Sequence, residues 1–138
     1  MRKNGFTLIE VLIAILLVGV AIAALVAANG SFTKANAAAT DLSTAEFLIE
    51  QVRERSISIR YDNLSSLNGT FSPPINSAGE SLNGFAVFSE QITVENVSES
   101  NFEQAVAYDS GFIRVTVKVF LNSKEISSAR WLRADIDE

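Results

Sequence analysis

The feature that most constrains this sequence is a long apolar run near its N-terminus. Between Phe6 and Ala28 only Thr7 and Glu10 are polar. A run of this length is enough to cross a bilayer as one helix, because about 20 residues suffice. Glu10 is the exception, since an unpaired carboxylate is costly in hydrocarbon. The sequence therefore predicts a membrane-spanning helix in which Glu10 has a function.

Composition limits what the rest of the chain can do. The 138 residues leave room for one modest domain after the apolar run, and the net charge is −5. Without Arg2 and Lys3 the charge becomes −7, which does not favour a polyanion, so we expect no nucleic-acid partner. The sequence contains no histidine and no cysteine, which removes common general bases, nucleophiles and zinc ligands. We therefore expect no enzymatic activity, no metal and no cofactor.

Two general interpretations of the N-terminus leave Glu10 unexplained. A secretory signal peptide would have a basic tip and a small-residue cleavage site such as Ala21-Ile22-Ala23, but the apolar run continues past that site. A plain signal anchor would use Arg2 and Lys3 to keep the N-terminus inside. Neither class of segment requires an acidic residue within the run.

A third interpretation accounts for the acidic residue. Residues 5–14 read GFTLIEVLIA after a short basic tip. This pattern closely resembles the N-terminus of type IV prepilins and of the pseudopilins of type II secretion systems. The resemblance implies that prepilin peptidase cuts between Gly5 and Phe6 and that Phe6 is then N-methylated. It also implies that Glu10 directs assembly, as the counter-charge for the α-amino group of Phe6 in a neighbouring subunit. Gly19 would be a point where the helix can melt on assembly.

The resemblance also implies a function and a location. The chain would be a structural subunit, a minor pilin or pseudopilin, of a type IV pilus or a type II secretion filament. Its partners would be prepilin peptidase, other pilin or pseudopilin subunits, an inner-membrane assembly platform and, before assembly, the lipid bilayer. It would cross the inner membrane once, with the N-terminus in the cytoplasm and the C-terminal domain outside, and then enter the filament.

The pattern after the apolar run predicts the rest of the fold. Apolar and small residues recur at helical spacing, which extends one helix from about Phe6 to about Ser58. We expect the second half of this helix to pack on a C-terminal antiparallel sheet of three to four strands, an α+β and pilin-like fold. The predicted stripe comprises Phe32, Ala35, Ala39, Leu42, Ala45, Ile49, Val52 and Ser56. The predicted segments are a leader at 1–5, a transmembrane or filament-core segment at 6–28, an amphipathic half-helix at 29–60, a variable loop at 61–84 and the sheet at 85–138.

Three strands are predicted in the last third of the chain. Alternating apolar residues at Phe85–Val97 indicate one strand, with an interruption near Ser89–Glu90. The clearest alternation is at Gly111–Leu121. A turn at Asn122-Ser123-Lys124 then leads into Glu125–Arg133. The sequence therefore predicts a hairpin at the C-terminal end of the domain.

Three groups of charged residues are weaker candidates for function. Arg53, Arg55 and Arg60 form a positive cluster, and the alternative function is a fibre-tip pilin that captures DNA or a surface ligand through such a surface. We favour salt bridges to neighbouring acidic residues for this cluster. We assign two acidic groups to solvent-exposed segments, a loop and the C-terminal tail, and expect no metal site at either. These groups are Glu95, Glu99 and Glu103, and Asp135, Asp137 and Glu138.

Overall fold

The computed structural model describes residues 6–136. The chain divides into two compact units, Met1–Ala39 and Thr40–Glu138, which are described separately. The predicted cleavage site is only partly covered, because Gly5 lies outside the described residues. Asp137 and Glu138 of the acidic tail lie outside them as well.

The first unit is helical throughout, from the start of helix α1. α1 comprises Leu8–Ser58, close to the predicted limits. Its first part is apolar on every side, and every described side chain before Ala39 is exposed. Gly19 and Gly30 sit inside the helix, where their cost in helix propensity is about 1 kcal/mol each. A helix that is apolar all round needs a lipid or protein environment to cover it.

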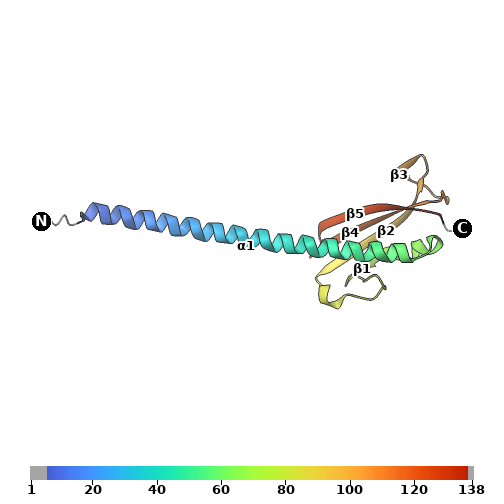
Figure 1. Ribbon diagram of the computed structural model, residues 1–138, viewed down its shortest axis with the longest axis horizontal. Coiled ribbons are helices and arrows are strands. Elements are labelled where there is room, and N and C mark those ends of the chain that lie inside the picture. Colours follow the sequence, from blue (N-terminus) through green and yellow to red (C-terminus); the bar gives the residue numbers. More distant parts are fainter. Residues whose placement is uncertain (1–5, 137–138) are drawn as a thin grey trace. The chain divides into compact units, whose positions relative to one another are not determined.

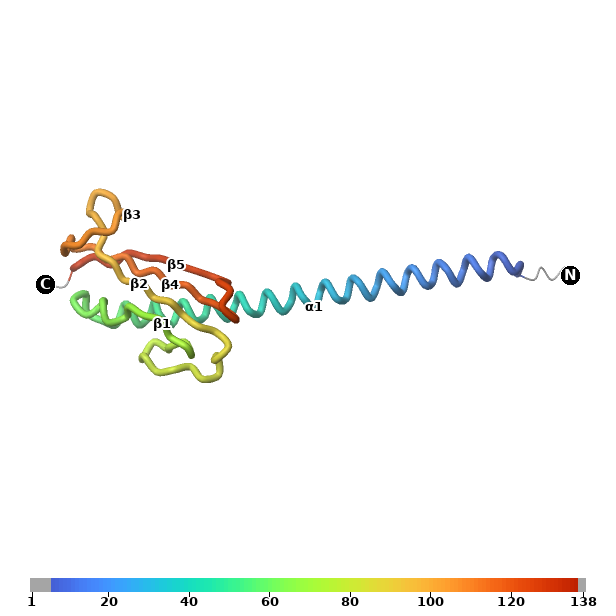
Figure 2. Tube along the Cα trace, turned by 180° about the vertical axis from the view of Figure 1, so that it is seen from behind, coloured from blue at the N-terminus to red at the C-terminus, as the bar shows by residue number. Residues whose placement is uncertain are grey.

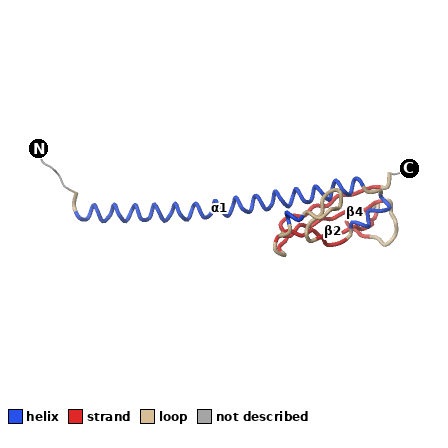
Figure 3. Tube along the Cα trace, turned by 90° about the horizontal axis from the view of Figure 1, so that it is seen from below, coloured by secondary structure: helices blue, strands red, loops and turns tan. Residues whose placement is uncertain are grey.

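The second unit begins within α1 and buries one stripe of this helix against a sheet. The buried helical residues are Ala45, Leu48, Ile49, Val52 and Ser56. The predicted stripe is right from Ala45 onward but wrong before it, because Phe32 and Leu42 are 69% and 41% exposed. Within this unit α1 lies along one face of the strands (Figure 3). Packing on the sheet therefore involves only the last four turns or so of the helix.

The sheet has five antiparallel strands in the order β1-β2-β4-β5, with β3 paired to the end of β2 (Figure 1). Two short 3₁₀ helices, η1 and η2, lie in the connections before β2. The elements are η1 Tyr61–Leu67, β1 Gly69–Phe71, η2 Asn83–Phe85, β2 Phe88–Ser98, β3 Asn101–Ala105, β4 Phe112–Leu121 and β5 Lys124–Ala134. Asn122 and Ser123 both have positive φ angles, of 50° and 68°, which suits the predicted two-residue hairpin turn.

Two predictions about the strands are wrong. β2 is not interrupted near Ser89–Glu90, because Glu90 pairs with Val119 in an unbroken ladder. The residues around Glu103 are not a loop but strand β3, since a short hairpin folds back at the end of β2. In Figure 2 this hairpin and the connection between β1 and β2 extend in opposite directions from the sheet.

The core lies between the sheet and α1. Alternate residues of β4 point inward, and Val115, Val117 and Val119 are 0% exposed. β2 adds Phe88 and Ile92, and η1 closes one end of the core with Leu64 and Leu67. At about 25 cal/mol per Å² of apolar surface, burial of such side chains is the main source of stability. The fold is α+β and pilin-like, as predicted.

Candidate assembly site

The start of α1 is closed by hydrogen bonds between Thr7 and Glu10. The N–H and the hydroxyl of Thr7 each donate to Glu10 Oε2, both at 3.0 Å. In return the N–H of Glu10 donates to Thr7 Oγ1 at 3.3 Å. Because α1 begins at Leu8, Thr7 is the N-cap and Glu10 the third helical residue, which is the reciprocal arrangement of a capping box. Thr7 and Glu10 therefore satisfy backbone donors that the helix itself leaves free.

The capping box lies wholly within the segment that would remain after processing. All of its atoms belong to Thr7 and Glu10, downstream of the predicted cut. Phe6, which would become the first residue, is 85% exposed. Glu10 Oε2 accepts both Thr7 donors, and the carboxylate stays exposed one turn from the chain start. The carboxylate therefore remains accessible to a further hydrogen-bond donor or cation.

The sequence analysis singles out Glu10 but not Thr7, and the role of Glu10 in assembly stays a prediction. The spacing Thr7-Leu8-Ile9-Glu10 is the sequence pattern of a capping box before an apolar run, so the signal was present. Gly19 is helical inside α1, and melting of this region on assembly stays a prediction. The processing roles of Gly5 and Phe6 also stay predictions.

The apolar part of α1 could cross a membrane. Its most apolar window of 18 residues has a mean hydropathy of 3.1, and none of that window is buried. No other helix among residues 6–136 meets the same criterion of length and composition. The segment behind the capping box is therefore suited to a bilayer or to the core of an assembly.

Two arginines of the predicted positive cluster contact other residues of the same domain. Arg53 pairs with Glu50 at 3.5 Å, and its guanidinium lies 5.3 Å from the centre of the Trp131 ring. Arg55 is half-buried and donates to the carbonyl of Ser77. The pair of Arg53 with Glu50 agrees with the salt bridges favoured for this cluster, whereas Arg55 bonds to a backbone carbonyl instead.

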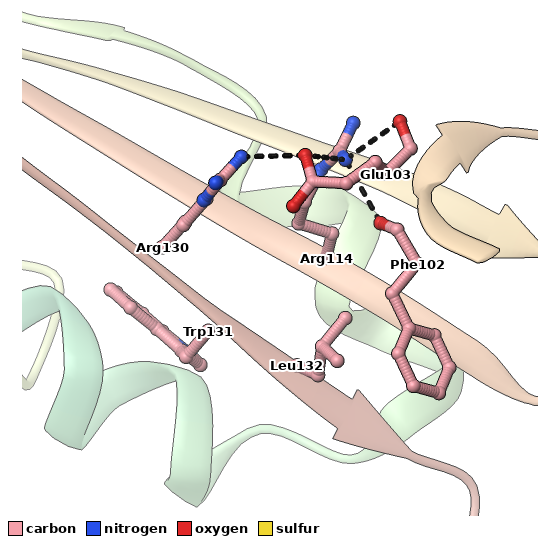
Figure 4. A pocket seen from close by; sticks show the side chains of 6 residues that line it. All are labelled: Phe102, Glu103, Arg114, Arg130, Trp131 and Leu132. Carbon is pink, nitrogen blue, oxygen red and sulfur yellow. Dashed lines mark hydrogen bonds and ion pairs between the residues drawn. The ribbon is translucent and has the colours of Figure 1, made fainter.

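A shallow hollow of about 270 Å³ lies on the outer face of the sheet, beside β3 (Figure 4). Phe102 and Leu132 form its apolar side. Its charged side consists of Glu103, which pairs with Arg130 at 2.7 Å and with Arg114 at 3.7 Å. Arg114 also pairs with Glu95 at 2.9 Å, so both arginines have acidic partners. This network fastens the β3 hairpin across the outer face of the sheet.

A second polar cluster lies near the end of α1. The Tyr61 hydroxyl donates to Asp109 Oδ1 at 3.1 Å. Burial, then the hydrogen bond and charge of Asp109, raises the pKa of Tyr61 to about 12. Tyr61 is therefore a neutral donor at any physiological pH. Within residues 6–136 no three His, Cys, Asp or Glu side chains come together as a group that could hold a metal ion.

The comparisons with known proteins identify the N-terminal segment. Residues 1–26 match the family described as the prokaryotic N-terminal methylation motif. No curated protein sequence and no solved structure matches this chain at a significant level. The chain thus carries the type IV prepilin-like signature over its first 26 residues, on a fold that is itself pilin-like. This motif implies processing by prepilin peptidase and assembly with other pilins.

Proposed function

We propose that this chain is a structural, non-catalytic subunit, a minor pilin or pseudopilin, of a type IV pilus or a type II secretion filament. The observation that carries the proposal is the methylation motif at residues 1–26. This motif includes the apolar first part of α1, in which Glu10 is the acidic residue. Support for a minor subunit comes from Ala27 and Ala28, which stand where many major pilins carry a proline. The helix continues through both alanines.

The proposed pathway begins in the membrane. Arg2 and Lys3 stay in the cytoplasm, by the tendency of positive residues to remain inside, and the C-terminal domain lies outside. Prepilin peptidase cuts between Gly5 and Phe6 and Phe6 is methylated. An assembly platform then moves the apolar helix from the inner membrane into the filament core. Burial against other helices replaces the lipid that covered the apolar residues.

Glu10 acts in this pathway through its charge. Cleavage creates an α-amino group on Phe6, and a buried carboxylate is tolerated when it is paired with a cation. Glu10 of one subunit pairs with Phe6 of the next and fixes the register between helices, as a single buried polar residue does in a coiled coil. The capping box holds the carboxylate at the chain start before this partner arrives.

Capture of DNA at a fibre tip is not part of this proposal. The net charge of −5 opposes it, and Arg53 and Arg55 are engaged within the domain.

Two substitutions separate the charge of Glu10 from its capping role. Glu10→Gln keeps a side-chain oxygen that can close the capping box but removes the charge. Thr7→Val removes the hydroxyl from the cap and leaves the carboxylate. We expect Glu10→Gln to be processed normally but to enter sheared filaments at least about tenfold less than wild type, because one buried charge lacks its partner. Immunoblots of filament and membrane fractions measure this ratio.

Thr7→Val is the matched control and is expected to enter filaments at close to the wild-type level. The proposed role of Glu10 is contradicted if Glu10→Gln assembles like wild type while Thr7→Val does not. That outcome would mean that Glu10 only caps the helix.

A further inference from the structure

Glu90 is an acidic residue within the apolar core of the second unit. It lies on β2 between Phe88 and Ile92, on the face of the sheet that α1 covers, and it is 0% exposed. Strands flank it on both sides, because it pairs with Phe71 of β1 and with Val119 of β4. The backbone at Glu90 is therefore held in the ladder and cannot turn its side chain outward.

The carboxyl group of Glu90 is poorly satisfied in this position. Its Oε2 accepts one hydrogen bond, from the N–H of Ile75 at 3.3 Å. Its Oε1 is buried and has no hydrogen-bond partner. A protonated carboxyl tolerates such a site far better than an ionised one, because burial without a counter-charge penalises the charged form.

Among residues 6–136, no lysine or arginine side chain forms an ion pair with Glu90. On α1, the guanidinium of Arg55 donates to the carbonyl of Ser77 in the loop formed by residues 72–82. On β4, Lys118 lies on the other face and pairs with Glu125. β1 carries no titratable residue. Asp62 of η1 is paired with Arg60, and Glu80 of the loop is exposed and accepts from Asn76.

The cover over Glu90 is the loop formed by residues 72–82. Pro74 is fully buried and Ile75 is 5% exposed, so these two residues close the core above the carboxyl group. Beyond the bond to Glu90, the loop is fastened to α1 at Ser77, whose N–H donates to Gln51 Oε1 at 3.1 Å. The carbonyl of Ser77 accepts from Arg55 at 3.4 Å. Two hydrogen bonds at one residue thus join the loop to the helix, in addition to the burial of Pro74 and Ile75, and local opening can break them.

Gly79 gives the loop close contact with Arg55. Its φ angle is +87°, and a Cβ atom there would stand 2.5 Å from the Arg55 guanidinium. The backbone of the loop therefore packs directly on the side chain of Arg55, whereas β2 is held by hydrogen bonds to β1 and β4. Unlike β1, β2 and β4 around Glu90, this loop is not a strand of the sheet.

We propose that loop 72–82 is a pH-dependent latch, which stays closed while Glu90 is protonated and opens when Glu90 ionises. Opening brings water and a hydration shell to the carboxylate, which relieves the cost of the buried charge. It also exposes Pro74 and Ile75 and the edge of the core beneath them. The second unit therefore presents two different surfaces on either side of the transition.

The direction of the pH effect follows from the two states of the latch. Burial raises the pKa of Glu90 to about 7 in the closed state, against an ordinary value of 4.5, and the bond from Ile75 opposes this rise. Between these two values the open state loses its proton while the closed state keeps it. Opening therefore becomes more favourable as the pH rises through this interval and is constant above it.

Hydrogen exchange of the full-length chain in detergent micelles tests this proposal. Protection factors, corrected for intrinsic exchange, are measured by mass spectrometry on peptides covering residues 72–84. From about pH 5 to about pH 8 we expect these factors to fall by roughly fifty- to a hundredfold and then to level off. Peptides from β4 serve as an internal reference for global unfolding.

Substitution of the carboxyl group supplies the second arm of the experiment. Glu90→Gln cannot ionise, so protection of the loop should become independent of pH. Glu80→Gln is the matched control in the same loop, where the carboxylate is exposed, and it should keep the wild-type profile. The fluorescence of Trp131 shows whether each variant has folded.

The proposal is overturned if the wild-type loop shows constant protection across this range, which is decided without any variant. It is also overturned if Glu90→Gln, once shown to be folded, keeps the full pH dependence.

Discussion

At the scale of single residues, two glutamates in apolar surroundings are accommodated in opposite ways. Glu10 accepts two hydrogen bonds from Thr7 and stays exposed at the start of α1. Glu90 is 0% exposed and accepts one hydrogen bond, from Ile75. An exposed carboxylate with local hydrogen-bond donors can stay charged without a cationic partner. A buried carboxyl with one donor favours the neutral form.

The stability of the second unit should therefore depend on Glu90 as the pH changes. The pKa of Glu90 is about 7 in the folded state, against an ordinary value of 4.5. The fold is therefore more stable at low pH, where Glu90 is protonated, than at high pH, where it is ionised. This contribution is lost as the pH rises towards 7. Between about pH 5 and about pH 8 the unfolding free energy of wild type should fall by up to about 2–3 kcal/mol relative to Glu90→Gln.

Urea unfolding of both chains in micelles at the two pH values, followed by Trp131 fluorescence, measures this difference. In Glu90→Gln the unpaired amide destabilises the fold at both pH values. The informative quantity is therefore how the difference in unfolding free energy between the two chains changes with pH. A difference that stays constant between the two pH values would contradict the account of Glu90.

At the scale of elements, β5 is joined to the end of α1 by a small polar cluster. The Trp131 Nε1–H donates to Ser56 Oγ at 3.1 Å, and Ser56 is 0% exposed. Arg133 donates to the carbonyl of Ser56, and Arg53 stacks over the Trp131 ring. This cluster sits where α1 ends, so it holds the last turn of the helix against the edge strand of the sheet.

Ser56→Ala should destabilise the second unit by about 1–3 kcal/mol, because it leaves the Trp131 donor without its partner in a half-buried site. Trp131→Phe should lose less unfolding free energy through this hydrogen bond, because it removes the donor itself and leaves no unpaired N–H. Ser58→Ala is the matched control, since Ser58 is exposed and its hydroxyl bonds only to its own helix. Equal unfolding midpoints for Ser56→Ala and Ser58→Ala in urea would contradict this role of the cluster.

The elements show what sequence patterns can predict. The alternation in β4 follows from burial of one face and agrees with the prediction, whereas the predicted stripe of α1 is buried only from Ala45 onward. The predicted interruption of β2 near Ser89–Glu90 is wrong because Phe85 and Val87 lie before the strand, and the inward alternation runs unbroken through Phe88, Glu90 and Ile92. β3 was missed because all its residues are exposed, and what fixes it is the pairing of Glu103 with Arg114 and Arg130. Such long-range contacts leave no periodicity in the sequence.

At the candidate assembly site the sequence draws attention to only one of the two residues of the capping box. Glu10 stands out because it is charged within an apolar run, but Thr7 is inconspicuous there. Its role becomes plain only with the helix start placed at Leu8, which makes Thr7 the N-cap.

At the scale of the whole molecule, the two units have different requirements. The first is an apolar helix that needs lipid or other helices around it, and the second is a domain with its own core. The net charge of the whole chain is −5, which does not favour binding to polyanions. Such a chain is suited to move between a bilayer and a protein filament, because both environments cover the same apolar residues.

The central claim is that the chain is processed at its N-terminus and assembled through the helix that remains. Intact-mass and peptide mass spectrometry of the chain, recovered from cells with and without an active prepilin peptidase, test this claim most directly. With the enzyme, the account predicts a mature chain that starts at N-methylated Phe6, and without it the chain should keep Gly5 and the residues before it. A mature chain that begins at Ala24, or one that keeps Met1 in the presence of the active peptidase, would contradict the account.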